Sequence, residues 1–377
     1  MSPEPATQGS ATGAELNRNR LATWMEASGV PAAYVTDPTS IAYLTGFHAE
    51  PMERLMALAV RPTGATLIVP GIEADAASAA TAGVEVRGWR DGEDPHALVV
   101  EALGSGQPRL AVETEHLTLA AYRRLSERVD PGEIVDATGA LRELRLRKTP
   151  EELDLLAHAA RLTDRVTERV LGRLRAGLSE LQVAALLDEA IAESGAQPAF
   201  PALVQSGPNS AQPHLGPTAR RIAPGDLVLL DFGAAWQGYR ADTTRMAVAG
   251  EPTPRQREVH AAVLEAHDRA LAAVRAGATA DSVDRAARAV LEQAGLGANF
   301  IHRTGHGIGL EAHEGPSLDP GSGLVLEPGM VCTIEPGAYL AGWGGVRIED
   351  DVAVTEDGCH VLTQAARELV VIPAEQS

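Results

Sequence analysis

The chain has 377 residues, of which 45% are hydrophobic, and a formal net charge of −19, from 32 Lys and Arg against 51 Asp and Glu. This length indicates two domains of ordinary size, with enough apolar material for a core in each. The acidic balance excludes nucleic acid and anionic membrane as expected partners, because both attract a basic surface. The two cysteines, Cys332 and Cys359, form neither a disulfide framework nor a zinc-binding spacing, as is typical of a reducing compartment.

The polar N-terminus has no apolar segment of the kind that a secretory signal contains, and no stretch of the sequence approaches a membrane span. We therefore expect a cytoplasmic protein with no membrane partner. About the first dozen residues are polar and are expected to be disordered.

The first part of the chain alternates expected helices and strands. Residues 15–28 are expected to form a helix and 32–35 a strand, and LMALAV and ATLIVP form two strands joined by the turn at 62–64. Further along, IEADAASAATAG and HLTLAAYRRLSERV favour helices, and RLAVE between them favours a short strand. This alternation predicts an α/β domain over residues 1–146, which contains no cluster of His and acidic residues.

A second domain is predicted over residues 147–377. Near its start Thr149 can cap a helix, Pro150 suits the first helical position, and Glu152 lies three residues after the cap. Two helix pairs are expected, each followed by strands, over residues 150–174 with 179–194 and 254–274 with 280–294. This repetition indicates an internal duplication of a unit made of a helix pair and a hairpin.

Five residues of the second domain are of the types that hard divalent cations select. Asp231 and Asp242 lie on two short strands of LLDFGAAWQGYRADTTR, and a turn centred on Trp236 and Gln237 would set them opposite each other, with Cβ atoms roughly 5 Å apart. Facing carboxylates repel unless a multivalent cation lies between them. Further carboxylate oxygens and an imidazole come from His306, Glu335 and Glu349. We predict two metal ions about 3.5–4 Å apart that activate a water for hydrolysis.

The motifs around these residues resemble those of the pita-bread metallopeptidases, a family that includes methionine aminopeptidase, aminopeptidase P and prolidase. The similarity rests on QSGPNSAQPH, DFGAAWQGYRADTTR, HRTGHGIGLEAHEGP, TIEPG and GVRIED, and on LRKTPEEL at the domain junction. In the first domain, TSIAYLTGF is similar to the YLTGF stretch of the creatinase-type N-terminal domain. The resemblance implies an α/β creatinase-like N-terminal domain followed by an α+β pita-bread catalytic domain.

Matched position by position, the resemblance implies a role for each candidate ligand. Asp231 would bind one metal ion, and Asp242 and Glu349 would bridge both. His306 and Glu335 would bind the second ion, and Glu335 would also hold the nucleophilic water as general base. This donor set suits Mn²⁺, and Co²⁺ or Zn²⁺ could occupy the same ligands. Because all five ligands are present, a metal-free creatinase-like amidinohydrolase and a non-catalytic binding protein are the more distant alternatives.

Three further histidines match positions that act on the substrate in this family, and Arg347 is a fourth candidate because of its place in the sequence. His214 would lie near the scissile peptide, and His313 would stabilise the developing gem-diolate through a hydrogen bond. His302 would line the pocket for the residue after the scissile bond. Arg347 lies two residues before Glu349 on an expected strand and shares its face, so it would orient a bridging acid or bind a substrate carboxylate.

The creatinase-type N-terminal domain favours the proline-specific branch of the family, whose enzymes cleave the bond between the first residue and a following proline in short peptides. In that branch the N-terminal domain of one subunit often helps to close its partner's active site, so the resemblance implies a homodimer. Residues that could reach the partner in this way are Asp37, Tyr43 and Arg54.

Dipeptidase and aminopeptidase activity differ in what the site must do beyond the proline. A dipeptidase must bind the carboxylate after the proline with a cation, for which His302, Arg303 and Arg347 are candidates, whereas aminopeptidase P must leave that end open for a longer chain. We favour Xaa-Pro dipeptidase (prolidase) activity because the N-terminal domain is compact, and we keep Xaa-Pro aminopeptidase activity as the alternative.

Overall fold

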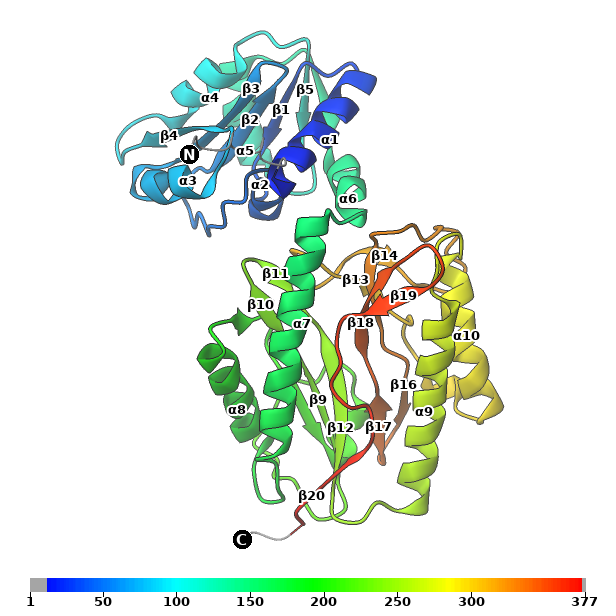
Figure 1. The fold of residues 1–377 in the computed structure, drawn as a ribbon. Coiled ribbons are helices and arrows are strands. Elements are labelled where there is room, and N and C mark those ends of the chain that lie inside the picture. The colour runs from blue at the N-terminus through cyan, green and yellow to red at the C-terminus, as the bar shows by residue number, and fades with distance from the viewer. Residues whose placement is uncertain (1–11, 375–377) are drawn as a thin grey trace, which may run out of the picture. The chain divides into compact units, whose positions relative to one another are not determined.

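The computed structural model describes residues 12–374. The expected disorder of about the first dozen residues concerns residues 1–11, which lie outside this range, and residue 12. The protein divides between Arg145 and Leu146 into two compact units, and each is described by itself (Figure 1). Within the described range, none of the helices combines the length and apolar character that a membrane span requires.

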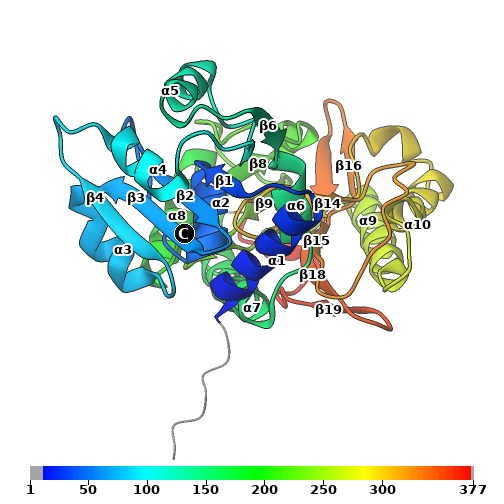
Figure 2. The same ribbon diagram turned by 90° about the horizontal axis from the view of Figure 1, so that it is seen from above.

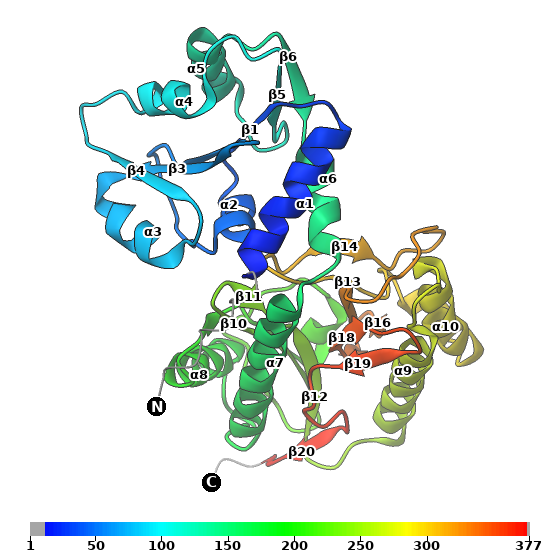
Figure 3. The ribbon, with the colours of Figure 1, turned by 45° about the horizontal axis from the view of Figure 1, so that its top comes forward.

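The N-terminal unit is a six-stranded mixed sheet with helices on both faces (Figure 3). The strand order is β4-β3-β2-β1-β5-β6, in which β2 pairs antiparallel with β1 and β3 and the other pairs are parallel. The strands are β1 (Ala32–Val35), β2 (Ala57–Arg61), β3 (Gly64–Pro70), β4 (Glu85–Trp89), β5 (Arg109–Val112) and β6 (Glu133–Asp136). The helices are α1 (Gly13–Ala27), α2 (Pro38–Thr45), α3 (Ala74–Ala80), α4 (Pro95–Leu103), α5 (Leu119–Val129) and α6 (Thr138–Leu146), with a 3₁₀ turn, η1 (Gly71–Glu73).

The expected elements of this unit are present, with shifts of a few residues at their ends. The first helix begins two residues earlier than expected because Thr12 caps it, its side chain accepting a hydrogen bond from the Glu15 N–H. Leu103 of α4, Leu125 of α5 and Leu110 of β5 lie in one fully buried cluster. One face of the sheet is therefore covered by α4 and α5.

The second unit contains two helix pairs that flank its strands (Figures 1 and 2). The helices are α7 (Pro150–Leu171), α8 (Glu180–Glu193), α9 (Pro254–Ala273) and α10 (Ala280–Gln293), with 3₁₀ turns η2 (Gly207–Ala211) and η3 (Gly297–Asn299). The first strands are β7 (Gln197–Pro198), β8 (Leu203–Ser206), β9 (Leu227–Phe232), β10 (Ala234–Trp236), β11 (Tyr239–Arg240) and β12 (Thr243–Ala249). The later strands are β13 (His306–Gly307), β14 (Glu314–Ser317), β15 (Val331–Ile334), β16 (Gly337–Leu340), β17 (Gly344–Arg347), β18 (Asp350–Val354), β19 (Cys359–Val361) and β20 (Val370–Ile372).

Two sheets carry the centre of this unit, one in the order β20-β12-β9-β8 and the other in the order β14-β13-β15-β18-β19. Every residue of the inner strand β9 is buried. Because alternate residues of a strand point to opposite sides, both faces of the sheet are covered at β9. Leu229 packs in the cluster of α9 and α10, whereas Val228 and Leu230 pack in the cluster of α7 and α8. Each helix pair thus covers one face of the same strands.

The two helix pairs are built alike, as an internal duplication would produce. In both pairs the loop between the helices reads Arg-Ala-Gly, and the glycine adopts positive φ, 89° at Gly177 and 81° at Gly277. The second helix of each pair then begins at a hydroxyl N-cap, Ser179 or Thr279.

The hairpin that carries the first two acids has a different register from the predicted one. Its turn residues are Gln237 and Gly238, with φ of 48° and 84°, and a two-residue hairpin turn of this kind needs positive φ at both positions. As a result Asp231 pairs with Thr244, and the prediction that Asp231 faces Asp242 directly is wrong. The observed pairing differs from the predicted one by two residues, so Asp231 and Asp242 still lie on the same face of the sheet, as diagonal neighbours.

Candidate active site

The five predicted ligands come from the two central sheets of the second unit. Asp231 lies near the end of β9, and Asp242 immediately precedes β12. His306 begins β13, while Glu335 follows β15 and Glu349 precedes β18. An antiparallel bridge between Thr244 and Glu349 joins the two sheets at this point. The fold therefore gathers residues that are more than 100 positions apart in the chain.

The ligand atoms form two overlapping groups. One oxygen each of Asp231, Asp242 and Glu349 lie within 4.8 Å of one another, and so do one ligand atom each of His306, Glu335 and Glu349. Glu349 belongs to both groups, which is the arrangement of a carboxylate shared by two ions.

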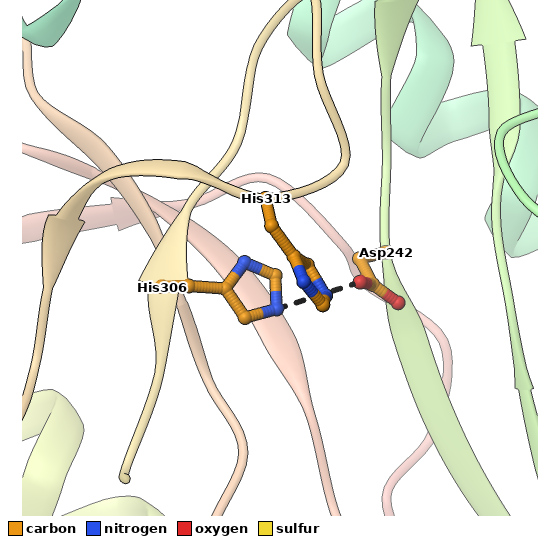
Figure 4. Close-up of side chains that lie close together, drawn as sticks. All are labelled: Asp242, His306 and His313. Carbon is orange, nitrogen blue, oxygen red and sulfur yellow. Dashed lines mark ion pairs between the residues drawn. The ribbon is translucent and has the colours of Figure 1, made fainter. Parts of the chain in front are cut away.

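A third group contains Asp242, His306 and His313 (Figure 4). The two imidazole rings lie beside each other, with centroids 4.0 Å apart, and His306 Nε2 is 3.9 Å from Asp242 Oδ2. Asp242 therefore belongs to two of the groups, one with Asp231 and one with His306, as Glu349 does. His313 was predicted to contact substrate, and its ring lies at the same centre as the predicted ligands.

The buried carboxylates fit divalent cations. Asp242 and Glu349 are 4% and 1% exposed, and one oxygen of each, as well as Asp231 Oδ1, has no hydrogen-bond partner among residues 12–374. Burial and then the neighbouring acids raise the pKa values of Asp242 and Glu349 well above their ordinary range, and burial raises the pKa of Glu335 to about 7. Bound cations would satisfy these buried oxygens, which have no hydrogen-bond partner, and would offset the repulsion between the carboxylates.

His306 is prepared to act as a neutral ligand. Burial lowers its pKa to about 3, and Nδ1 lies 3.1 Å from the Gly307 carbonyl oxygen, to which it can donate. Such a bond leaves the Nε2 lone pair for a metal ion, and Nε2 is 3.3 Å from Glu335 Oε1. A Cβ on Gly305 would lie 1.9 Å from the Thr333 carbonyl oxygen, so only glycine allows this close approach of the strands.

Arg347 contacts the acids from one side of the site. It is 3% exposed, and its Nη2 donates to Asp231, its Nε to Thr244 Oγ1 at 2.9 Å and its Nη1 to the Tyr339 hydroxyl at 2.9 Å. The Thr244 hydroxyl in turn donates to Glu349 Oε2 at 2.6 Å. Arg347 therefore holds Asp231 directly and Glu349 through a hydroxyl.

The remaining predicted residues surround this centre. His302 Nε2 lies 2.9 Å from the Tyr339 hydroxyl, and burial lowers the pKa of His302 to about 4. His214 is exposed on the loop after β8, and burial, with a smaller contribution from His214, lowers the pKa values of His302 and His313. Arg303 is half-buried and donates to Ser317 Oγ at 2.8 Å, and its charge partly opposes the effect of burial, which raises the pKa of Glu335.

Comparison with known proteins identifies the family. The profile described as metallopeptidase family M24 matches residues 154–356, and that of the creatinase/prolidase N-terminal domain matches residues 18–147. The chain belongs to metallopeptidase family M24. The predicted family and the predicted enzyme class are thereby confirmed.

Relatives of this metallopeptidase extend over nearly the whole chain. The chain is 36% identical to the Xaa-Pro dipeptidase of Lactobacillus helveticus, in an alignment that covers 95% of this chain and 99% of the relative. The structure of Xaa-Pro dipeptidase from Bacillus anthracis is similar with a TM-score of 0.88 at 35% identity, covering 95% and 100%. That of X-Pro aminopeptidase from Thermotoga maritima has a TM-score of 0.85 at 32% identity, covering 91% and 98%. The fold class is confirmed as a creatinase-like domain followed by a pita-bread catalytic domain.

Two residues of the M24 site were missed by sequence reasoning. Thr244 lies two residues after Asp242 on a strand, so the two-residue period of strands could have placed it on the same face. Tyr339 joins His302 to Arg347, and the sequence carried no signal for this, because Tyr339 lies on β16, Arg347 on β17 and His302 in a loop far before them in the chain.

The candidates of the N-terminal domain for contact with a partner subunit are engaged in their own unit. Tyr43 is 1% exposed and donates its hydroxyl to the Leu144 carbonyl, so its burial removes it from the candidates. Asp37 caps α2 by accepting from the Thr39 N–H. Arg54 forms an ion pair with Asp91 and has a third of its side chain exposed.

Proposed function

We propose that this M24 metallopeptidase is an Xaa-Pro dipeptidase that releases the first residue from dipeptides ending in proline. The observation that carries the proposal is the complete ligand set in a chain that resembles Xaa-Pro dipeptidases over nearly its full length. We keep the predicted domain limits, 1–146 and 147–377, and the predicted homodimer and cytoplasmic location, as parts of the proposal.

The metal centre would hold two divalent ions. Asp231 would bind one ion, His306 and Glu335 would bind the other, and Asp242 and Glu349 would be shared by the two, because each of these two acids belongs to more than one group of candidate ligands. Four carboxylates and a neutral imidazole suit Mn²⁺, and the same ligands accept Co²⁺ or Zn²⁺. When bound, such ions polarise the scissile carbonyl and lower the pKa of a water.

The side chains around the centre orient the substrate and move the proton. Glu335 takes a proton from the attacking water and delivers it to the leaving prolyl nitrogen. His214 and His313 donate hydrogen bonds to the carbonyl oxygen as charge develops on it, each contributing on the order of a hundredfold in rate. The prolyl amide has no N–H, so this arrangement does not depend on a donor that ordinary peptidases engage.

Arg303 is the cation best suited to the substrate carboxylate. His302 is neutral near pH 7, since its pKa is lowered to about 4, and its ring is bonded to Tyr339. The three guanidinium nitrogens of Arg347 donate to Asp231, Thr244 and Tyr339. Arg303 is more exposed than Arg347, directly follows His302 in the chain, and can present a planar fork to a carboxylate.

Xaa-Pro aminopeptidase activity is the second candidate, because the chain is also similar to the Thermotoga maritima X-Pro aminopeptidase over 91% of its length. In that case the space beyond the proline would accept a further residue, and Arg303 would not be needed for binding.

The test compares Leu-Pro with Leu-Pro-Pro, using metal-stripped enzyme with and without Mn²⁺ and following leucine release. Metal-dependent release from Leu-Pro is the expected result, and Arg303→Met should raise the KM for Leu-Pro about tenfold to a hundredfold, as the loss of a charged hydrogen bond predicts. The matched control is Arg285→Met, at an exposed α10 arginine paired with Asp281. Release mainly from Leu-Pro-Pro would establish the aminopeptidase, and no metal-dependent release from either would overturn the proline-specific assignment.

A further inference from the structure

The loop that carries His214 fixes the position of that residue through its backbone. His214 is exposed, and its ring forms no hydrogen bond within the described range of 12–374. It lies between β8, which ends at Ser206, and Thr218, on a segment with only a short 3₁₀ turn. The imidazole can therefore be held in place only if the loop itself is held.

The side chain of Gln205 forms hydrogen bonds to the loop backbone on both sides of His214. This side chain is fully buried, and Nε2 donates to the carbonyl oxygens of Gln212 at 2.8 Å and Leu215 at 2.9 Å, with that of Pro213 at 3.4 Å. An amide nitrogen has two hydrogens, so the two short bonds use its full capacity. These bonds hold the backbone on both sides of His214.

Glu180, in the first turn of α8, ties down the two ends of the same loop. It is 0% exposed, and Oε1 accepts from the Ser206 N–H at 2.7 Å, the Ser206 hydroxyl at 2.8 Å and Asn209 Nδ2 at 3.0 Å. Oε2 accepts from the Thr218 N–H at 3.0 Å and from its hydroxyl at 2.5 Å. The loop ends are thus bonded to a helix whose own face packs in a buried cluster.

The second helix pair uses a buried acid in the same way. Asp284 of α10 is 0% exposed, accepts from the Thr304 hydroxyl at 2.9 Å and pairs with Arg288. Arg288 then donates to the carbonyl oxygen of His302 at 3.0 Å. In both helix pairs, a buried acid on the second helix therefore contacts a segment that carries a histidine of the site, although the two acids lie at different positions of their helices.

We propose that Gln205 and Glu180 are positioning residues, which set the imidazole of His214 against the scissile peptide by holding the backbone of its loop. The inference rests on the role given to His214 in the proposed function. A displacement of about 1 Å in a catalytic group can lower the rate on the order of a hundredfold, so these bonds matter for turnover as well as for folding.

The experiment is a double-mutant cycle on full-length, Mn²⁺-loaded enzyme with Leu-Pro as substrate, in the variants Gln205→Met, His214→Ala and the two combined. If Gln205 acts through His214, Gln205→Met lowers kcat about tenfold or more, with unchanged metal content and KM. In the His214→Ala background the same change then has no further effect on kcat. A purely structural residue would not produce this dependence on His214.

The matched control is Gln256→Met. Gln256, on α9, is also a buried glutamine and is 6% exposed. Its Nε2 donates to the backbone carbonyl of Gly225 at 2.8 Å, and the loop that contains Gly225 carries none of the proposed site residues. The substitution Gln256→Met should lower the unfolding temperature without changing kcat. If Gln205→Met does not yield folded protein, Gln205→Asn and Glu180→Gln complete the same cycle.

Equal loss of kcat in both backgrounds, or no loss at all, would overturn the positioning role. If His214→Ala itself leaves kcat unchanged while Leu-Pro is still cleaved, the role of His214 and this inference both fail, and the dipeptidase assignment stands. Failure of the wild-type enzyme to cleave Leu-Pro would instead overturn the proposed function.

Discussion

Removal of the metal ions should make the stability of this enzyme fall as the pH rises from about 4.5 to 7. Glu335 is buried among other acids, and burial raises its pKa from 4.5 to about 7. Between these values the folded protein keeps the proton that the unfolded chain releases, so the free energy of unfolding decreases with rising pH. The sign is opposite to that of a salt-bridged carboxylate, whose pKa is lowered by folding. Asp242 and Glu349, with raised pKa values, act in the same direction.

The size of the effect follows from the interval between the two pKa values. From 4.5 to about 7, at 1.36 kcal/mol for each pH unit, the loss from Glu335 alone is about 3 kcal/mol. In a unit of the size of the catalytic unit, Leu146–Ser377, each kcal/mol changes the unfolding temperature by about 2–4 °C, so the expected change is about 6–12 °C. Bound cations replace the proton and remove this dependence.

The assay is thermal unfolding of chelator-treated wild type and Glu335→Gln at pH 5 and pH 8. The variant has no charge to bury, so it should match the wild type at pH 5 and exceed it by about 3 kcal/mol at pH 8. The control is Glu258→Gln, at an exposed glutamate paired with Arg255, which should change stability by less than about 0.5 kcal/mol at either pH. If Glu335→Gln gives no gain at pH 8, or the same gain at pH 5, the reasoning from burial and repulsion is wrong.

Three further predictions concern individual residues. Asp242→Ala or Glu349→Ala should abolish activity and remove at least one metal ion, measured by elemental analysis, and full activity in either variant would contradict the dinuclear centre. His214→Ala should lower kcat about a hundredfold with the metal content unchanged, whereas loss of metal or unfolding would make His214 structural. Lys148→Met removes the partner of Glu314 in a buried ion pair of 2.7 Å and should cost about 3–5 kcal/mol in chemical unfolding, and a change below about 1 kcal/mol would refute the importance of the pair.

The amino-acid sequence by itself determined the helices of the catalytic domain and the identity of the ligand candidates. The start of α7 follows from local chemistry, because Thr149 and Glu152 form a capping box, with Pro150 at the first helical position, and this needs no distant contact. The metal-binding residues were recognisable because their types and motifs are set by the chemistry of hard cations. In both cases the information lies within a short motif, because each cap and each ligand is recognised from its immediate neighbours in the chain.

Tertiary structure alone decided the hairpin register and the partners of each polar side chain. The register depended on whether Gly238 lies inside the turn, since the two turn residues adopt positive φ. Arg347 was expected to point into the site, but its contacts with Asp231 and Tyr339 required strands that meet only in the folded protein. Likewise Gln205 and Glu180 carry no local signal, because a buried donor or acceptor acquires its role from backbone groups that packing brings to it.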